Sequence, residues 1–232
     1  MSDNPRARIF ARVEQASGTA DTDVIARELA ALGTAPGADL PAPDLATAFL
    51  VNVLKNFGSA DCVANRSGVV KAVAEYLYLH FRSHRLVAGN DPHLAAMPWR
   101  EAGVLPRFGT VEPGEPVTLS YALLGVAEIG ATVTLTGKAN PAANNLLSEH
   151  HIVVVDSARL VSDMEHAWEA INQEMTKTGR PRGINFIAGP SSTADIEGKL
   201  VYGAHGPRNW HVILMGDVPA SALAEAHTLA GR

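Results

Sequence analysis

The sequence predicts an α/β protein in which helices cover both faces of a mostly parallel, Rossmann-like sheet, giving three layers. Three observations favour this class. Short runs of β-branched and apolar residues alternate with longer amphipathic stretches. A strand, a helix and another strand follow one another between residues 61 and 88, an order that favours parallel pairing. Residues 152–155 are apolar at every position, which is typical of a strand buried on both faces.

Residues 1–43 are predicted to form a helical appendage and linker rather than part of the core. Ile9, Phe10 and Val13 give residues 4–16 the spacing of a short amphipathic helix, and residues 23–32 look helical as well. Residues 33–43 are rich in Gly, Pro and Ala, a composition typical of a linker or a long surface loop. The α/β domain is therefore expected to span residues 44–232.

The first half of this domain is predicted element by element. Asp44 is placed to cap a helix whose apolar positions recur up to residue 57, and Gly58 is placed to stop it. Residues 61–64 predict a strand, Ser67 can cap a second helix, and residues 85–88 predict the next strand. Residues 90–103 are expected to be loop with one or two helical turns.

The stretch 119–137 is nearly uncharged and about long enough to span a bilayer. Alternation over residues 117–121 and β-branching over residues 131–136 favour strands at its two ends. Because Glu128 lies near its midpoint, and a charge is costly in lipid, we interpret the stretch as a buried helix turning into a buried strand.

The remaining elements complete a sheet of about seven strands. Ser162 and Glu165 form the pattern of a capping box, and the helix that follows is expected to turn Trp168 inward and to end by Gly179. Residues 184–187 and 211–214 predict two further strands. Ligands of such sheets bind beyond the carboxyl ends of the strands.

Composition excludes several classes of protein. The formal net charge of -5, without a Lys/Arg cluster, argues against nucleic-acid binding. Residues 1–15 lack the apolar segment of a signal peptide, so we expect a cytoplasmic protein. The single cysteine, Cys62, allows no internal disulfide and no four-cysteine cluster, and we interpret it as a small core residue. The nine histidines show no metal-binding spacing, so no metal site is predicted.

Hydroxyl groups follow the strand predicted at residues 184–187. Ser191, Ser192 and Thr193 come after a Gly-Pro turn, at a point where a helix could start. They would cap that helix or bind an anion with its backbone N–H groups, and the two roles are compatible. Asp195 and Glu197 stand two residues apart, so they form an acid–base pair only if the segment is extended; otherwise they are solvated charges.

Two further residues are candidates for chemistry. His205 lies in a glycine-rich turn between Gly203 and Gly206, where it could act as a general base, donate a hydrogen bond to a ligand, or simply face solvent. Glu128, surrounded by apolar residues, must be paired or protonated if it is buried, so it is either a functional group or a structural brace. His211, which opens the last strand, is interpreted as structural.

We expect the two loops to form one pocket that prefers anions. The loop at residues 191–197 follows one strand and the turn at residues 203–207 precedes another, so both reach the same rim if these strands are neighbours in one sheet. Lys199 would add positive charge, and at least one of the two carboxylates should point away from the pocket.

The most specific pattern lies near the C-terminus. Residues 191–197 read SSTADIE, residues 200–207 read LVYGAHGP and residues 210–213 read WHVI. In this order and spacing they closely resemble the C-terminal signature of the LUD-domain family. Residues 127–130, AEIG, resemble a second family block, but Ile129 and Ala131 stand where the family usually has threonine. The resemblance covers roughly residues 44–217.

The resemblance implies a fold similar to the sugar-phosphate isomerase and CoA-transferase group. It also implies a role in lactate utilization, in which lactate is oxidised to pyruvate together with iron–sulfur partner proteins. The clusters would then lie on the partner chains, with no cofactor in this chain. The motif assigns no catalytic residue. Two alternatives stay open: a stand-alone isomerase or transferase acting on a phosphorylated sugar or a thioester, and a non-catalytic assembly or regulatory subunit, which the two lost hydroxyls favour slightly.

Overall fold

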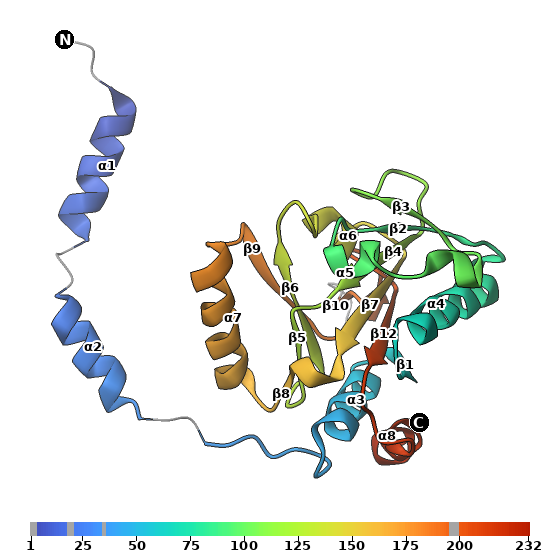
Figure 1. Ribbon diagram of the computed structural model, residues 1–232. Coiled ribbons are helices and arrows are strands. Elements are labelled where there is room, and N and C mark those ends of the chain that lie inside the picture. The colour runs from blue at the N-terminus through green and yellow to red at the C-terminus, as the bar shows by residue number, and fades with distance from the viewer. Residues whose placement is uncertain (1–3, 18–20, 34–35, 195–199) are drawn as a thin grey trace. The chain divides into compact units, whose positions relative to one another are not determined.

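The computed structural model describes residues 4–17, 21–33, 36–194 and 200–232 (Figure 1). The chain divides into two units, Met1–Gly37 and Ala38–Arg232. The first unit contains helices α1 (Pro5–Ala16) and α2 (Thr22–Ala31), which lie where the apolar spacing predicts them. The Asn4 and Asp21 side chains accept hydrogen bonds from the first backbone N–H groups of these helices. Neither helix has a buried residue.

The second unit is built on a six-stranded sheet whose paired strands are all parallel. This confirms the predicted mostly parallel sheet. Its order is β1 (Ser59–Val63), β12 (Asn209–Met215), β7 (His150–Asp156), β4 (Val117–Tyr121), β2 (Arg85–Ala88) and β3 (Leu105–Phe108).

Helices cover both faces of this sheet. On one face lie α3 (Leu45–Lys55) and α8 (Ala222–Ala230), which Figure 1 shows side by side, and on the other lies α4 (Arg66–Phe81). Strand β7 joins the two layers, because Val153 and Val155 pack with α3 whereas Ile152 and Val154 pack with α4. The prediction that residues 152–155 are buried on both faces is confirmed.

Short helices complete the connections. They are α5 (Pro92–Ala95), the 3₁₀ turn η1 (Trp99–Ala102), α6 (Ala142–Leu146) and the 3₁₀ turn η2 (Ser157–Arg159). Within the described ranges, none of the helices combines the length and hydropathy that a bilayer-spanning segment needs.

A second, four-stranded sheet corrects the interpretation of residues 119–137. Its order is β8 (Leu160–Val161), β5 (Leu124–Val126), β6 (Ala131–Thr136) and β9 (Gly183–Ile187), and α7 (Met164–Thr178) covers it. The expected helix is instead the end of β4, then β5 and a tight turn into β6. Gly130 makes this turn possible, since its φ is +59° and a β-carbon there would collide with the backbone of Asn52. A short apolar run fits a buried helix and a buried strand equally well.

The segment after β9 is a hairpin, not a helix start. Strand β10 (Ser192–Ala194) pairs antiparallel with β11 (Leu200–Tyr202), with Thr193 opposite Val201. Residues 192–194 form a strand rather than the first turn of a helix, so the predicted helix cap by Ser192 or Thr193 is wrong. Residues 195–199 lie outside the described residues.

Two helix starts also differ from the prediction. Helix α4 is capped by Asn65 rather than Ser67, through a hydrogen bond from Gly68 N. Helix α7 is capped by Asp163, which accepts a hydrogen bond from His166 N at 2.9 Å, and not by Ser162. Trp168 of α7 is 43% exposed, so it packs on the edge of the core rather than inside it.

Candidate functional site

The loop after β9 and the turn before β12 meet, as the sequence predicts. Ser191 N donates a hydrogen bond of 2.8 Å to Pro207 O, and Gly203 N donates one of 2.8 Å to Ser191 O. Gly206 is packed so closely on Ser191 that a β-carbon at residue 206 would lie 3.1 Å from the Ser191 β-carbon. The assumed reason was wrong, however, because β9 belongs to the four-stranded sheet and β12 to the six-stranded sheet.

A pocket of about 720 Å³ opens beside this junction. Of the predicted site residues, the ligand-binding candidates Gly203 and Gly206 and the catalytic candidate His205 line it. Ser191 lies directly behind Gly206, Ser192 is exposed on β10, and Thr193 is half-buried. The remaining lining consists of Ala204, which belongs to the same predicted turn, and of Leu146, Leu147, Ser148, Glu149 and Arg208, which were not among the predicted site residues.

This pocket lies at the amino edge of the central sheet. Glu149 directly precedes β7 and Arg208 directly precedes β12, and those two parallel strands are neighbours. The expected location at the carboxyl edge is therefore corrected. A turn that precedes a strand of a parallel sheet lies at the edge where all of its strands begin.

Arg208 brings a positive charge to the pocket. Its backbone N–H donates a hydrogen bond of 2.9 Å to Glu149 O, which joins the two lining segments. Its side chain crosses Gly203 so closely that a β-carbon there would collide with Arg208 Cγ, and Gly203 also has a φ of +77°. The positive φ favours glycine at position 203, and a larger residue there would also displace the Arg208 side chain. Both Arg208 and His205 are exposed at the pocket, where their side chains can reach a carboxylate or a phosphate.

A buried cluster of rings lies at the same edge of the sheet, beneath α4. Tyr76 Oη lies 2.8 Å from Nδ1 of His150, and Asn209 Nδ2 lies 2.9 Å from the other ring nitrogen of His150. The amide of Asn209 donates, so the His150 proton is assigned to Nδ1 and points at Tyr76. Burial, with His80 nearby, lowers the pKa of His150 and favours the neutral ring.

His211 lies near the start of the neighbouring strand β12, where it pairs with Ile152. Its Nδ1 lies 2.8 Å from Ser59 Oγ, and its ring centre lies 4.6 Å from that of Tyr76. Nε2 lies 3.4 Å from Asp61 Oδ2 without hydrogen-bond geometry, and this contact lowers the pKa of Asp61. The sequence patterns did not predict this cluster of rings. A histidine near the start of each of two adjacent parallel strands was the available signal, but the strand order was needed to use it.

Glu128 is not the buried acid that its apolar surroundings suggested. It is exposed in the turn between β5 and β6. Its Oε2 accepts a hydrogen bond of 3.2 Å from Met164 N, the first residue of α7. Its backbone O accepts a hydrogen bond of 3.0 Å from the Asn52 side chain. These contacts brace the turn against α7 and α3.

Asp195 and Glu197, together with Lys199, lie outside the described residues. Cys62 is half-buried, and its burial, reinforced by Asp61, raises the pKa of the thiol to about 11. In the part of the chain that the structure describes, no three His, Cys, Asp or Glu residues gather as a metal site would require.

Comparison with known proteins identifies the domain that builds these features. Residues 116–215, which run from the start of β4 to the end of β12, match the LUD domain. The chain is 35% identical over 102 residues to lactate utilization protein C of Shouchella clausii, a match that covers 44% of each chain. It is 28% identical over 182 residues to lactate utilization protein C of Macrococcus caseolyticus, covering 72% of this chain and 78% of that protein.

The crystal structure of a DUF162 family protein from Deinococcus radiodurans shares the fold. It superimposes with a TM-score of 0.54 at 22% identity and covers 74% of this chain and 96% of that one. The match to the Shouchella clausii protein spans less than half of that protein's length. The resemblance to the LUD-domain family seen in the motifs near the C-terminus is confirmed for residues 116–215, which match the LUD domain.

Proposed function

We propose that this chain is a subunit of an L-lactate utilization system that oxidises lactate to pyruvate together with iron–sulfur partner proteins. One observation carries the proposal. The segment that is 35% identical to a lactate utilization protein C has the length of the LUD domain itself. That domain supplies both sides of the pocket at the amino edge of the sheet.

The pocket offers the groups that a hydroxy acid needs. Lactate and pyruvate each carry one carboxylate, which the guanidinium of Arg208 can bind with two parallel hydrogen bonds. His205 lines the same pocket and can accept the proton of the lactate hydroxyl. In this proposal Ser191, directly behind Gly206, and Ser192 and Thr193 on β10 shape the loop and its anion preference. Asp195 and Glu197 stay candidates from the sequence alone.

The electrons are proposed to leave through the partner chains. Removing the C2 hydrogen and the hydroxyl hydrogen of lactate releases two protons and two electrons. Iron–sulfur clusters accept one electron each, so two clusters with cysteine ligands, or one cluster reduced and reoxidised twice, would take the two electrons. A chain with the single cysteine Cys62 cannot supply such a ligand set. The proposal therefore needs iron–sulfur proteins bound to this chain.

The test is genetic and biochemical in the native host. A strain lacking this chain should fail to grow on L-lactate, and the wild-type chain should restore growth. Affinity purification of that chain should recover a protein with iron and acid-labile sulfide. A strain that carries Arg208→Gln should grow poorly on L-lactate. A strain that carries Arg100→Gln, which removes an exposed positive charge outside the pocket, should grow normally. Normal growth of the deletion strain would rule the proposal out.

A second candidate, a non-catalytic assembly subunit, has one observation in its favour. The LUD-domain turn that usually carries two threonines has Ile129 and Ala131 here, and Ala131 is fully buried. Glu128 in the same turn braces α7. If Arg208→Gln and His205→Gln both support growth and still co-purify with the iron–sulfur protein, this role replaces the catalytic one.

The stand-alone alternative gives a different result. A chain that purifies without partners, and that turns over a phosphorylated sugar or a thioester, would be an isomerase or a transferase rather than a subunit of a lactate-oxidising system.

A further inference from the structure

A second and larger hollow lies where the two sheets part. It measures about 950 Å³ and reaches the carboxyl ends of β4 and β7, at Tyr121 and Asp156. Its other wall is formed by the end of β6, the end of α7 and the residues that lead into β9. We call it the carboxyl-edge groove. It lies at the edge where α/β sheets of this type bind ligands, opposite the pocket that contains His205.

We propose that the carboxyl-edge groove binds a phosphorylated organic molecule carrying two or more negative charges. The inference does not depend on the proposed role in lactate oxidation, because it concerns a different edge of the sheet and a different set of residues.

Positive charge gathers in the groove although the chain as a whole is negative, at -5. Lys138, Arg180 and Arg182 are exposed on the wall formed by β6 and by the connection from α7 to β9. Among the described residues, none forms a hydrogen bond or an ion pair with these three side chains. A monoanion such as lactate would leave most of this charge unpaired, whereas a phosphate group can accept hydrogen bonds from several cations at once.

The three carboxylates of the groove differ in the hydrogen bonds that they accept. Asp91 accepts hydrogen bonds from the backbone N–H and the ring of His93, at 2.7 and 2.9 Å. Asp156 Oδ1 accepts one from Ala158 N at 3.0 Å, in the turn that carries Arg159. Only Glu174, half-buried on α7, lines the groove without such a contact among the described residues. The wall therefore keeps an excess of positive charge.

A buried donor without an acceptor also lies on the groove. Asn140 lines it and is 7% exposed. Its Oδ1 accepts a hydrogen bond of 3.2 Å from Ser120, but its Nδ2 has no partner within the described ranges. Leaving a buried N–H group unpaired costs about 1–3 kcal/mol. A ligand oxygen seated beside Asn140 would give that amide its acceptor.

The size and the rest of the lining indicate an organic molecule rather than a free ion. Leu123, Leu135 and Pro181 contribute apolar surface, and Tyr121, stacked on His93 with ring centres 4.5 Å apart, closes one side. A volume of about 950 Å³ is at the upper end for ligand pockets and exceeds what inorganic phosphate would fill.

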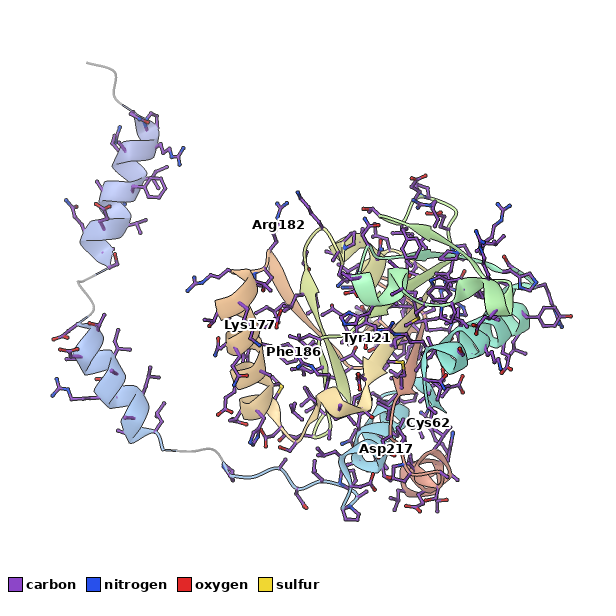
Figure 2. The ribbon with its side chains drawn as sticks, in the orientation of Figure 1. Cys62, Tyr121, Lys177, Arg182, Phe186 and Asp217 are labelled. Atoms are coloured by element: carbon purple, nitrogen blue, oxygen red, sulfur yellow. The ribbon has the colours of Figure 1, made fainter. Side chains whose placement is uncertain are left out.

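The full-length chain is titrated by calorimetry with two probes, inorganic pyrophosphate and ADP, and with L-lactate for comparison. We expect both probes to bind and ADP to bind more tightly, because it adds apolar contact. Arg182→Gln and Lys138→Gln should each weaken the binding of ADP about tenfold, the effect of losing one charge-assisted hydrogen bond. Lys177→Gln removes the same charge from α7 outside the groove, and it should change nothing; Figure 2 labels both Lys177 and Arg182.

Three results would overturn the proposal. One is the absence of binding of both probes to the wild-type chain. Another is an equal loss of affinity in Lys177→Gln and Arg182→Gln, which would indicate attraction by the general surface charge. The third is tighter binding of L-lactate than of ADP with the same dependence on Arg182, which would make the groove a carboxylate site. Circular dichroism of each variant checks that an altered affinity is not an altered fold.

Discussion

His151 illustrates how burial alone sets the charge of a side chain in this fold. It lies on β7 with no exposed surface, and its Nε2 is 3.0 Å from Ser120 Oγ. Its Nδ1 has no partner among the residues that the structure describes. Burial lowers the pKa of His151 to about 3, so the ring is neutral near pH 7.

This shift predicts a loss of stability in acid. In the unfolded chain His151 takes up its proton near the usual value of 6.5, whereas the folded chain resists protonation down to about pH 3. The contribution of the neutral His151 ring to the free energy of unfolding is complete above pH 6.5. It falls between pH 6.5 and 3 by at most ~1.4 kcal/mol per pH unit. Urea unfolding gives the free energy of unfolding at about pH 7.5 and at about pH 5. The fall in this free energy from the higher to the lower pH should be smaller for His151→Gln than for the wild type. His227→Gln, at an exposed site, should behave like the wild type.

Cys62 is expected to react slowly with thiol reagents. Because its pKa is raised to about 11, little thiolate is present near pH 7, and the side chain is half-buried as well. Ellman's reagent should therefore modify the folded chain much more slowly than the urea-unfolded chain. Modification at the same rate in both states would contradict this prediction, and Cys62→Ser gives the background signal.

Glu128 shows where reasoning from neighbours in the sequence fails. Its neighbours are apolar because they belong to β5 and β6, yet Glu128 itself lies in the exposed turn between those strands. Glu128→Gln should lower the free energy of unfolding by about 0.3–1 kcal/mol, since a carboxylate near the start of α7 is lost. Growth on L-lactate should not change. A growth defect with unaltered stability would instead place Glu128 in a functional site.

At the scale of single elements, the neighbouring residues Ser162 and Asp163 at the start of α7 contribute differently to capping this helix. Asp163 accepts the hydrogen bond from His166 N, and its pKa is lowered to about 2 first by this bond. Asp163→Ala should cost about 1 kcal/mol of stability, whereas Asp163→Asn, which keeps a capping oxygen, should cost less. Ser162→Ala should be nearly neutral. Urea unfolding midpoints measure all three variants, and a larger effect at Ser162 than at Asp163 would restore the cap predicted from the sequence.

The elements that the sequence predicted well are those with a strong periodic pattern. Helix α3 and strands β2 and β4 agree with their predicted positions, because packing sets their apolar spacing, α3 against one hydrophobic cluster and β2 and β4 against the other. Strands β5 and β10 were missed for a different reason. Each has three residues and is defined by its pairing partner, and such pairing leaves little trace in the local sequence.

For the molecule as a whole, the location of the candidate site was the least predictable feature. The meeting of Ser191 with Gly203 and Gly206 agrees with the prediction, because the motif keeps both loops close in the sequence. Arg208 and the segment at residues 146–149 come together only because β12 lies beside β7. The carboxyl-edge groove likewise joins segments from residue 91 to residue 182. The order of the strands in the sheet determines which of these segments meet, and that order cannot be read from a single sequence.

The division into two units predicts the result of a truncation. Helices α1 and α2 bury none of their residues, and Ile9, Phe10 and Val13 are each more than half exposed. The three hydrophobic clusters of the second unit consist of residues from Leu40 onward. Removing residues 1–37 therefore leaves every residue of these clusters in place. The shortened chain should keep the thermal midpoint and the urea midpoint of the full chain, measured by circular dichroism. A clear fall in both midpoints would mean that these helices cover apolar surface of the domain in solution.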